Sequence, residues 1–249
     1  MGLVPATFLA YTECTTGTNL IIPSSNEASR QVELANIQAW ADRNNLRLNC
    51  SKSCEVIFSD GRRRSRSVPV PELAPLPGIT SSRCLKVLGV NIAGDFVSQH
   101  IQRLVTTTGQ TVYTLRVLRS RGLSDTDLQH VYRSTVIARL MYAASAWRGF
   151  ASTSDRQRID SVINCARRNG YCASDLPSFE ELCEDVDDEL FNKAVCMPSQ
   201  VLHSLLPPPS NALQKYNLRK RTHVLQLPEH TTHLSDKNVI TRMLYKNSY

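Results

Sequence analysis

The side chains of this 249-residue chain that could do metal, thiol or acid–base chemistry are scattered rather than gathered in one motif. Cys50 and Cys54 could form half of a metal site, but no zinc-module spacing follows, and buried or idle thiols are the simpler interpretation. The six histidines form no recognisable catalytic triad. His230 and His233 could ligate a metal, although surface histidines explain them more simply. We therefore predict no metal site among these residues.

One acidic block stands apart from this scatter. Residues 180–189 hold seven carboxylates, which a nuclease could use. Apolar residues at helical spacing lie between them, and Ser178 to Glu181 has the form of a capping box. The pattern favours a solvated face of a capped helix over a catalytic cluster.

The overall charge favours an anionic partner. Lys and Arg number 29 against 22 Asp and Glu, which gives a net charge of +7. Nucleic acid is the first expectation and a membrane surface the second, with an ordinary basic protein as the alternative. No run approaches a membrane span, no secretory signal is visible, and no small-molecule substrate is evident. The dispersed cysteines indicate reduced thiols in a cytoplasmic or nuclear protein. The basic run 62–66 is either a solvated loop or a phosphate and nuclear-import patch.

The first part of the chain predicts a small α+β unit. A polar turn containing Lys52 joins two of its predicted strands, and Gly89 lies inside the last one. A glycine there indicates a bulge or the close approach of another backbone, with plain sheet packing as the alternative. The predicted elements are strands at 20–22, 46–48, 55–58 and 84–92 and a helix at 27–43.

From about Ser98 the apolar period changes to that of helices. Two long amphipathic helices should pack as an antiparallel pair. The first runs from about Ser98 and is stopped by Gly122, and the second is capped by Ser124 to Asp127 and runs to Trp147. Further helices are expected at 154–168 and after Ser178, and then a basic, loop-rich tail. The predicted domains are 1–94, 95–206 and 207–249. The outer faces of the helical pair are expected to carry seven arginines, namely Arg103, Arg116, Arg119, Arg121, Arg133, Arg139 and Arg148.

Four stretches in this order resemble the reverse transcriptase of a non-LTR, LINE-type retrotransposon of the CR1 or Jockey kind. Leu20–Pro23 resembles the strand that follows the catalytic turn. Trp40–Lys52 resembles the family's W…N-L-x-L-N-x-x-K segment, and Leu85–Val90 resembles its Y-L-G-V strand, the primer grip. Leu128–Trp147 resembles the first helices on the thumb side. The resemblance covers residues 18–170 and implies an α+β chain with a small antiparallel palm remnant, a helical thumb and a C-terminal domain.

In that family a Tyr/Phe-Ala-Asp-Asp turn precedes the Leu-Ile-Ile strand, and its carboxylates help to hold two Mg²⁺ ions. Aligned on Leu20, the two aspartates fall on Thr16 and Gly17, which cannot replace anionic ligands. The resemblance therefore implies a truncated chain with a degenerate active site, no intact catalytic residue and no bound metal. Magnesium is expected only for an intact member of the family.

Lys52 matches the family lysine that protonates the pyrophosphate leaving group, a general-acid role. A solvated turn lysine is the alternative, and without metals it is the favoured one. The resemblance and the basic helix faces together imply contacts with the backbone of RNA or DNA. The candidate residues for these contacts are Lys52, Lys86, Gly89, Arg103, Arg116, Arg119, Arg133 and Arg139.

Two functional hypotheses follow. The first is a catalytically incomplete fragment of a retrotransposon reverse transcriptase with residual, salt-sensitive binding to nucleic acid. The second is a non-enzymatic nucleic-acid-binding or interaction module domesticated from such an element. A third possibility is a fragment that does not fold stably, because its palm half lacks pairing strands and would expose apolar faces.

Overall fold

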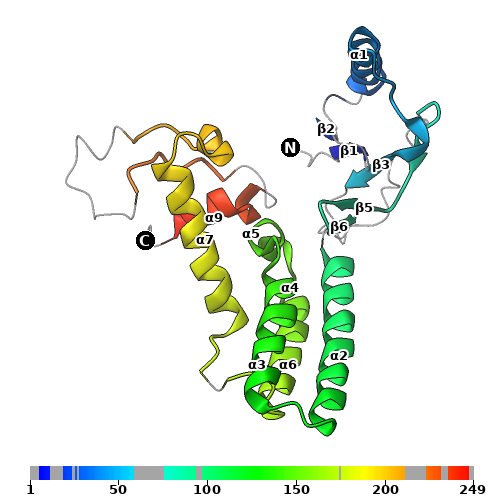
Figure 1. Ribbon diagram of the computed structural model, residues 1–249. Helices are drawn as coiled ribbons and strands as arrows, with labels where there is room; N and C mark the ends of the chain where they lie inside the picture. Colours follow the sequence, from blue (N-terminus) through cyan, green and yellow to red (C-terminus); the bar gives the residue numbers. More distant parts are fainter. Residues whose placement is uncertain are drawn as a thin grey trace, which may run out of the picture. The chain divides into compact units, whose positions relative to one another are not determined.

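The computed structural model describes residues 6–11, 19–23, 26, 28–58, 76–93, 97–173, 175–210, 223–230 and 235–246. These residues form two small sheets and a larger set of helices, so the predicted α+β class is confirmed (Figure 1). The chain divides into two compact units, residues 1–100 and 101–249. The predicted boundaries at 94/95 and 206/207 stay predictions.

A four-stranded sheet organises the first unit. Its strands are β1 (Ala6–Tyr11), β2 (Asn19–Pro23), β3 (Ser53–Phe58) and β4 (Thr80–Ser81), in the order β2-β1-β3-β4. Strand β1 is antiparallel to both of its neighbours. No strand was predicted for β1, because the residues Ala-Thr-Phe-Leu-Ala-Tyr do not alternate in polarity.

Helix α1 (Ser29–Arg43) ends in a Schellman motif, which sets the direction of the residues that follow. The N–H of Leu46 donates to the carbonyl of Ala41 at 2.8 Å, and Asn45 lies in the left-handed region with a φ of 55°. The next residues, 46–49, have no regular structure, so the predicted strand at 46–48 is wrong. Leu48 instead packs against a buried cluster of Leu34, Leu76 and Ile79.

The predicted strand at 84–92 is two strands. Strand β5 (Cys84–Val87) turns through Leu88 and Gly89 into β6 (Val90–Ala93), and the two pair as an antiparallel hairpin. Leu88 has a φ of 45° and Gly89 a φ of 87°. Positive φ at both central residues is the signature of a type I′ turn, whose twist matches that of paired strands. Gly89 is therefore a turn residue rather than a residue inside a strand.

Two helices open the helical unit. Helix α2 (Ser98–Ser120) is linked through Gly122 to α3 (Asp125–Tyr132), and the side chain of Ser124 caps α3 as predicted. The predicted single helix 124–147 is interrupted. A π turn (Arg133–Ile137) leads into α4 (Ala138–Met141), and α5 (Ala144–Trp147) follows after Ala143, which has a φ of 52°. The indole N–H of Trp147 donates to the carbonyl of Tyr142, which this break frees (3.0 Å).

Three further helices of this unit lie among the described residues. Helices α6 (Thr153–Arg168) and α7 (Phe179–Cys196) both begin with capping boxes, at Ser152 and Ser178. Helix α9 (Val239–Tyr245) lies in the tail and packs beside α7 (Figure 1). Phe191 of α7 and Leu225, Met243 and Leu244 of the tail form one buried cluster. Short 3₁₀ turns lie at Cys50–Lys52, Arg148–Phe150, Val201–Leu205 and Ser235–Lys237.

Candidate nucleic-acid interface

The strand register brings Lys52 to the end of the sheet at which β1 ends and β2 begins. Antiparallel pairing sets Tyr11 opposite Ser53, and Ala10 opposite Asn19. The last residue of β1 and the first residue of β2 therefore lie at the same sheet end as the turn that holds Lys52. Thr16 and Gly17, onto which the expected aspartates fall, lie outside the described residues.

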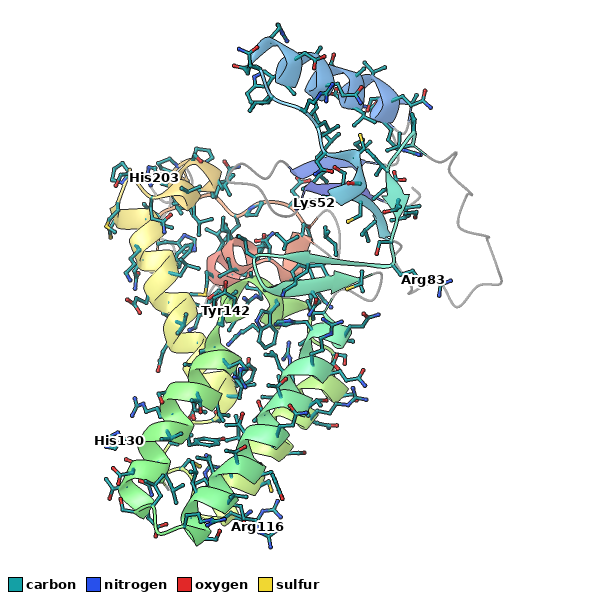
Figure 2. All side chains as sticks on the ribbon, turned by 45° about the vertical axis from the view of Figure 1, so that its right-hand side comes forward. Lys52, Arg83, Arg116, His130, Tyr142 and His203 are labelled. Carbon is teal, nitrogen blue, oxygen red and sulfur yellow. The ribbon has the colours of Figure 1, made fainter. Side chains whose placement is uncertain are left out.

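The turn itself is organised by Asn49. Its side-chain oxygen accepts hydrogen bonds from the Lys52 N–H (3.2 Å) and from the Ser51 hydroxyl (2.7 Å). The hydroxyl of Ser53 donates to the Asn49 carbonyl at 3.0 Å. These bonds fix the backbone of the 3₁₀ turn, while the Lys52 side chain is exposed (Figure 2). The turn can present an ammonium group at this sheet end.

The β5–β6 hairpin carries Lys86 and an apolar tip. Lys86 is exposed, and Leu88 at the tip is 86% exposed. The base is anchored, because Leu85 is buried against Val56 of β3. The described stretch 76–93 contains two basic residues and no acidic one. Its local field therefore favours an anionic partner.

The predicted arginines differ in what they contact. The side chains of Arg116 and Arg133 are exposed and make no ion pair or hydrogen bond with the described part of the chain, and Arg103 is also exposed. Arg119 pairs with Asp125 at 3.0 Å, donates to the Asn169 carbonyl and lies over the ring of Tyr171. Arg139 is half-buried and donates to the hydroxyl of Thr111 at 3.4 Å. Arg119 and Arg139 therefore hold the bundle together, which leaves less of each guanidinium for a phosphate.

The acidic helix is more than a solvated face, as one residue shows. The Asp187 side chain is 1% exposed, and its Oδ2 accepts from Arg242 at 2.8 Å and lies 3.3 Å from Nε of Arg148. Arg242 also donates to the carbonyl of Ser145. The solvated-face interpretation is wrong for this residue, since its basic partners come from distant segments with no local sequence signal. The expected position of Arg148 on an outer helix face is wrong as well, because its side chain is 12% exposed and pairs with Asp187. The arrangement links α5, α7 and α9 within the helical unit.

The two cysteines of the candidate metal half-site pack against different apolar clusters. Cys50 packs against the Leu34 cluster, whereas Cys54 packs against Val56 and Leu85. Burial, with a smaller effect of the nearby Cys84 thiol, raises the pKa of Cys54. His230 pairs with Asp236 at 2.9 Å, and His233 lies outside the described residues. Among the residues that the structure describes, no group of three His, Cys, Asp or Glu side chains could hold a metal ion.

The described helices include none with the length and apolar character needed to cross a bilayer. The chain was also compared with known proteins. Models of known families gave no match, and neither did the curated proteins or the solved structures.

Proposed function

We propose that this chain is the C-terminal part of a LINE-type retrotransposon reverse transcriptase, that it lacks the catalytic carboxylates, and that it binds nucleic-acid backbone. The observation that carries the proposal is the register of β1 with β2 and β3. Pairing of Tyr11 with Ser53 and of Ala10 with Asn19 sets the end of β1, the start of β2 and Lys52 at one end of the sheet. In the family, the metal-binding turn occupies the corresponding connection between two strands.

The remaining elements support the same proposal. In this interpretation the sheet with α1 is the end of a palm, the β5–β6 hairpin is the primer-grip segment, and the helices from α2 onward are the thumb and C-terminal domain. The exposed cations Lys86, Arg116 and Arg133 would contact phosphates. Such contacts position a nucleic acid without reading its sequence.

Catalysis is not part of the proposal, because the chain lacks the ligands that the reaction requires. Two-metal phosphoryl transfer depends on carboxylates that hold both ions. The family aspartates fall on Thr16 and Gly17, and Glu13 is the only acid between Tyr11 and Asn19. We expect no template-dependent incorporation by the purified chain with Mg²⁺ or Mn²⁺ in a primer-extension assay. Incorporation would refute the proposed loss of activity.

Binding is tested by fluorescence anisotropy with a short RNA–DNA duplex over a range of salt. The double variant R116E/R133E should bind more weakly. If each arginine neutralises one phosphate, the slope of log K against log salt should become less negative by about 2. The matched control is R156E, which changes an exposed arginine of α6 outside the predicted set. Equal losses for both variants would indicate diffuse charge attraction and contradict the proposed interface.

A further inference from the structure

The tip of the β5–β6 hairpin holds a leucine that neither burial nor backbone preference explains. Leu88 is 86% exposed and has a φ of 45°. The left-handed region is unfavourable for a non-glycine residue, and Asn or Asp before Gly is the usual solution in a type I′ turn. An exposed position in that conformation would be more stable with asparagine. Strained residues of this kind cluster at functional sites.

The hairpin holds this leucine in a defined position. Val87 pairs with Val90 immediately below the tip, and Lys86 pairs with Asn91. Leu85 is buried against Val56, so the base of the hairpin is packed on the four-stranded sheet. A side chain held on such a base keeps its position when it contacts a partner.

The surroundings of the tip select the class of partner. Arg83 (Figure 2) and Lys86 are exposed. The stretch 76–93 holds no acidic residue. One leucine beside a glycine offers far less than the roughly 800 Å² per partner of a stable protein interface. A single apolar side chain flanked by cations suits nucleic acid, because proteins insert Leu, Ile, Met or Phe between base steps while basic groups hold the phosphates.

We propose that Leu88 is an apolar wedge that enters a base step of a bound duplex and partly unstacks it, with Lys86 on a flanking phosphate. The inference rests on the proposed nucleic-acid binding and adds a deformation of the ligand. Gly89, which has no side chain, lets the duplex backbone approach the tip closely. Partial unstacking is unfavourable, and the additional contacts of a kinked duplex offset it.

The test uses the full chain and a short duplex carrying 2-aminopurine, whose fluorescence rises when it is unstacked. Wild-type protein should raise this fluorescence on saturation, whereas L88N should bind and leave it unchanged. L88M keeps an apolar tip and should retain the rise. The control V201N makes the same apolar-to-amide change at an exposed residue of the helical unit and should behave as wild type.

Thermal unfolding separates this role from a structural one. L88N should raise the melting temperature of the first unit, because asparagine relieves the strain of the turn, while it removes the fluorescence rise. Equal fluorescence for L88N and wild type, with binding intact, would overturn the wedge and leave the proposed function standing. Absence of binding by wild type at low salt would overturn both.

Discussion

Replacing Asp187 by asparagine should destabilise the helical unit severely while changing almost nothing in shape. The Asp187 carboxylate is 1% exposed and neutralises two guanidinium groups, those of Arg242 and Arg148. An amide of the same size removes the charge and turns a donor toward at least one of these cations. Arg242 also holds the tail, through the carbonyls of Ser145 and Lys237. We therefore expect α9 to loosen from α7.

The magnitude follows from what remains buried without a counter-charge. Removing one partner of a buried ion pair costs about 3–5 kcal/mol. Arg148 and Arg242 keep 12% and 19% of their side-chain surface in water, and Arg148 retains Glu180 at 3.2 Å. Both facts favour the lower end, about 3 kcal/mol. With a urea dependence of about 2 kcal/mol per molar, the unfolding midpoint should fall by about 1.5 M.

The assay is urea unfolding followed by tryptophan fluorescence. The chain has two tryptophans, and Trp147 is 1% exposed and stacks on Phe179 of α7, whereas Trp40 is 53% exposed. A W40F background therefore makes Trp147 the reporter of the helical unit.

D185N, at an exposed acid of the same helix, is the matched control and should stay within about 0.5 kcal/mol of wild type. The double variant D187N/R242M should lose less than the sum of its single losses. A D187N midpoint equal to that of D185N would refute the reasoning.

Three further outcomes are expected in the helical unit. Burial, opposed by Arg148, raises the pKa of the Cys183 thiol from 9.0 to about 11. The unfolded thiol ionises first, so the free energy of unfolding should fall as pH rises from 9.0 to about 11. Denaturation curves should show a weaker fall for C183A than for the exposed-site control C196A. Removing the α7 cap with S178A should cost about 1 kcal/mol by urea titration, and S204A, at an exposed serine, should cost little. Alanine at Gly149 would place Cβ 2.0 Å from the Lys237 carbonyl oxygen and should lower the melting temperature. The matched variant G109A has no atom within 4 Å of its added Cβ and should raise the melting temperature. The reverse order of melting temperatures would contradict the packing.

The helices were predictable because their signals are local. Ser124 and Ser178 cap helices where their side chains were expected to, and Asn169 and Gly170 end α6. Each signal consists of residues within one turn of the helix end, so sequence spacing and spatial contact coincide. The strand at Leu20 to Ile22 was equally readable, since Pro23 stops an apolar run.

The features that were not predicted depend on contacts between residues far apart in the sequence. Strand β1 is defined by pairing with β2 and β3, and its own letters carry no alternation. The hairpin at Leu88 was not predicted, because residues 84–92 are mostly apolar and read as one strand. A leucine is also a poor candidate for a positive φ. Nothing in the spacing distinguishes Asp187 from its exposed neighbours, because its partners Arg148 and Arg242 lie far from it in the sequence.

The structure also reduces the set of arginines in the candidate interface that can bind a phosphate. A guanidinium that already binds a carboxylate, a carbonyl and an aromatic ring, as Arg119 does, must give up those contacts before it can bind a phosphate. Exposed Arg116 and Arg133 pay no such cost. The same reasoning applies in the first unit, where anchoring at Leu85 leaves Lys86 and Leu88 directed outward. Affinity should therefore depend on the few cations that the fold does not use for itself, rather than on the net charge of +7.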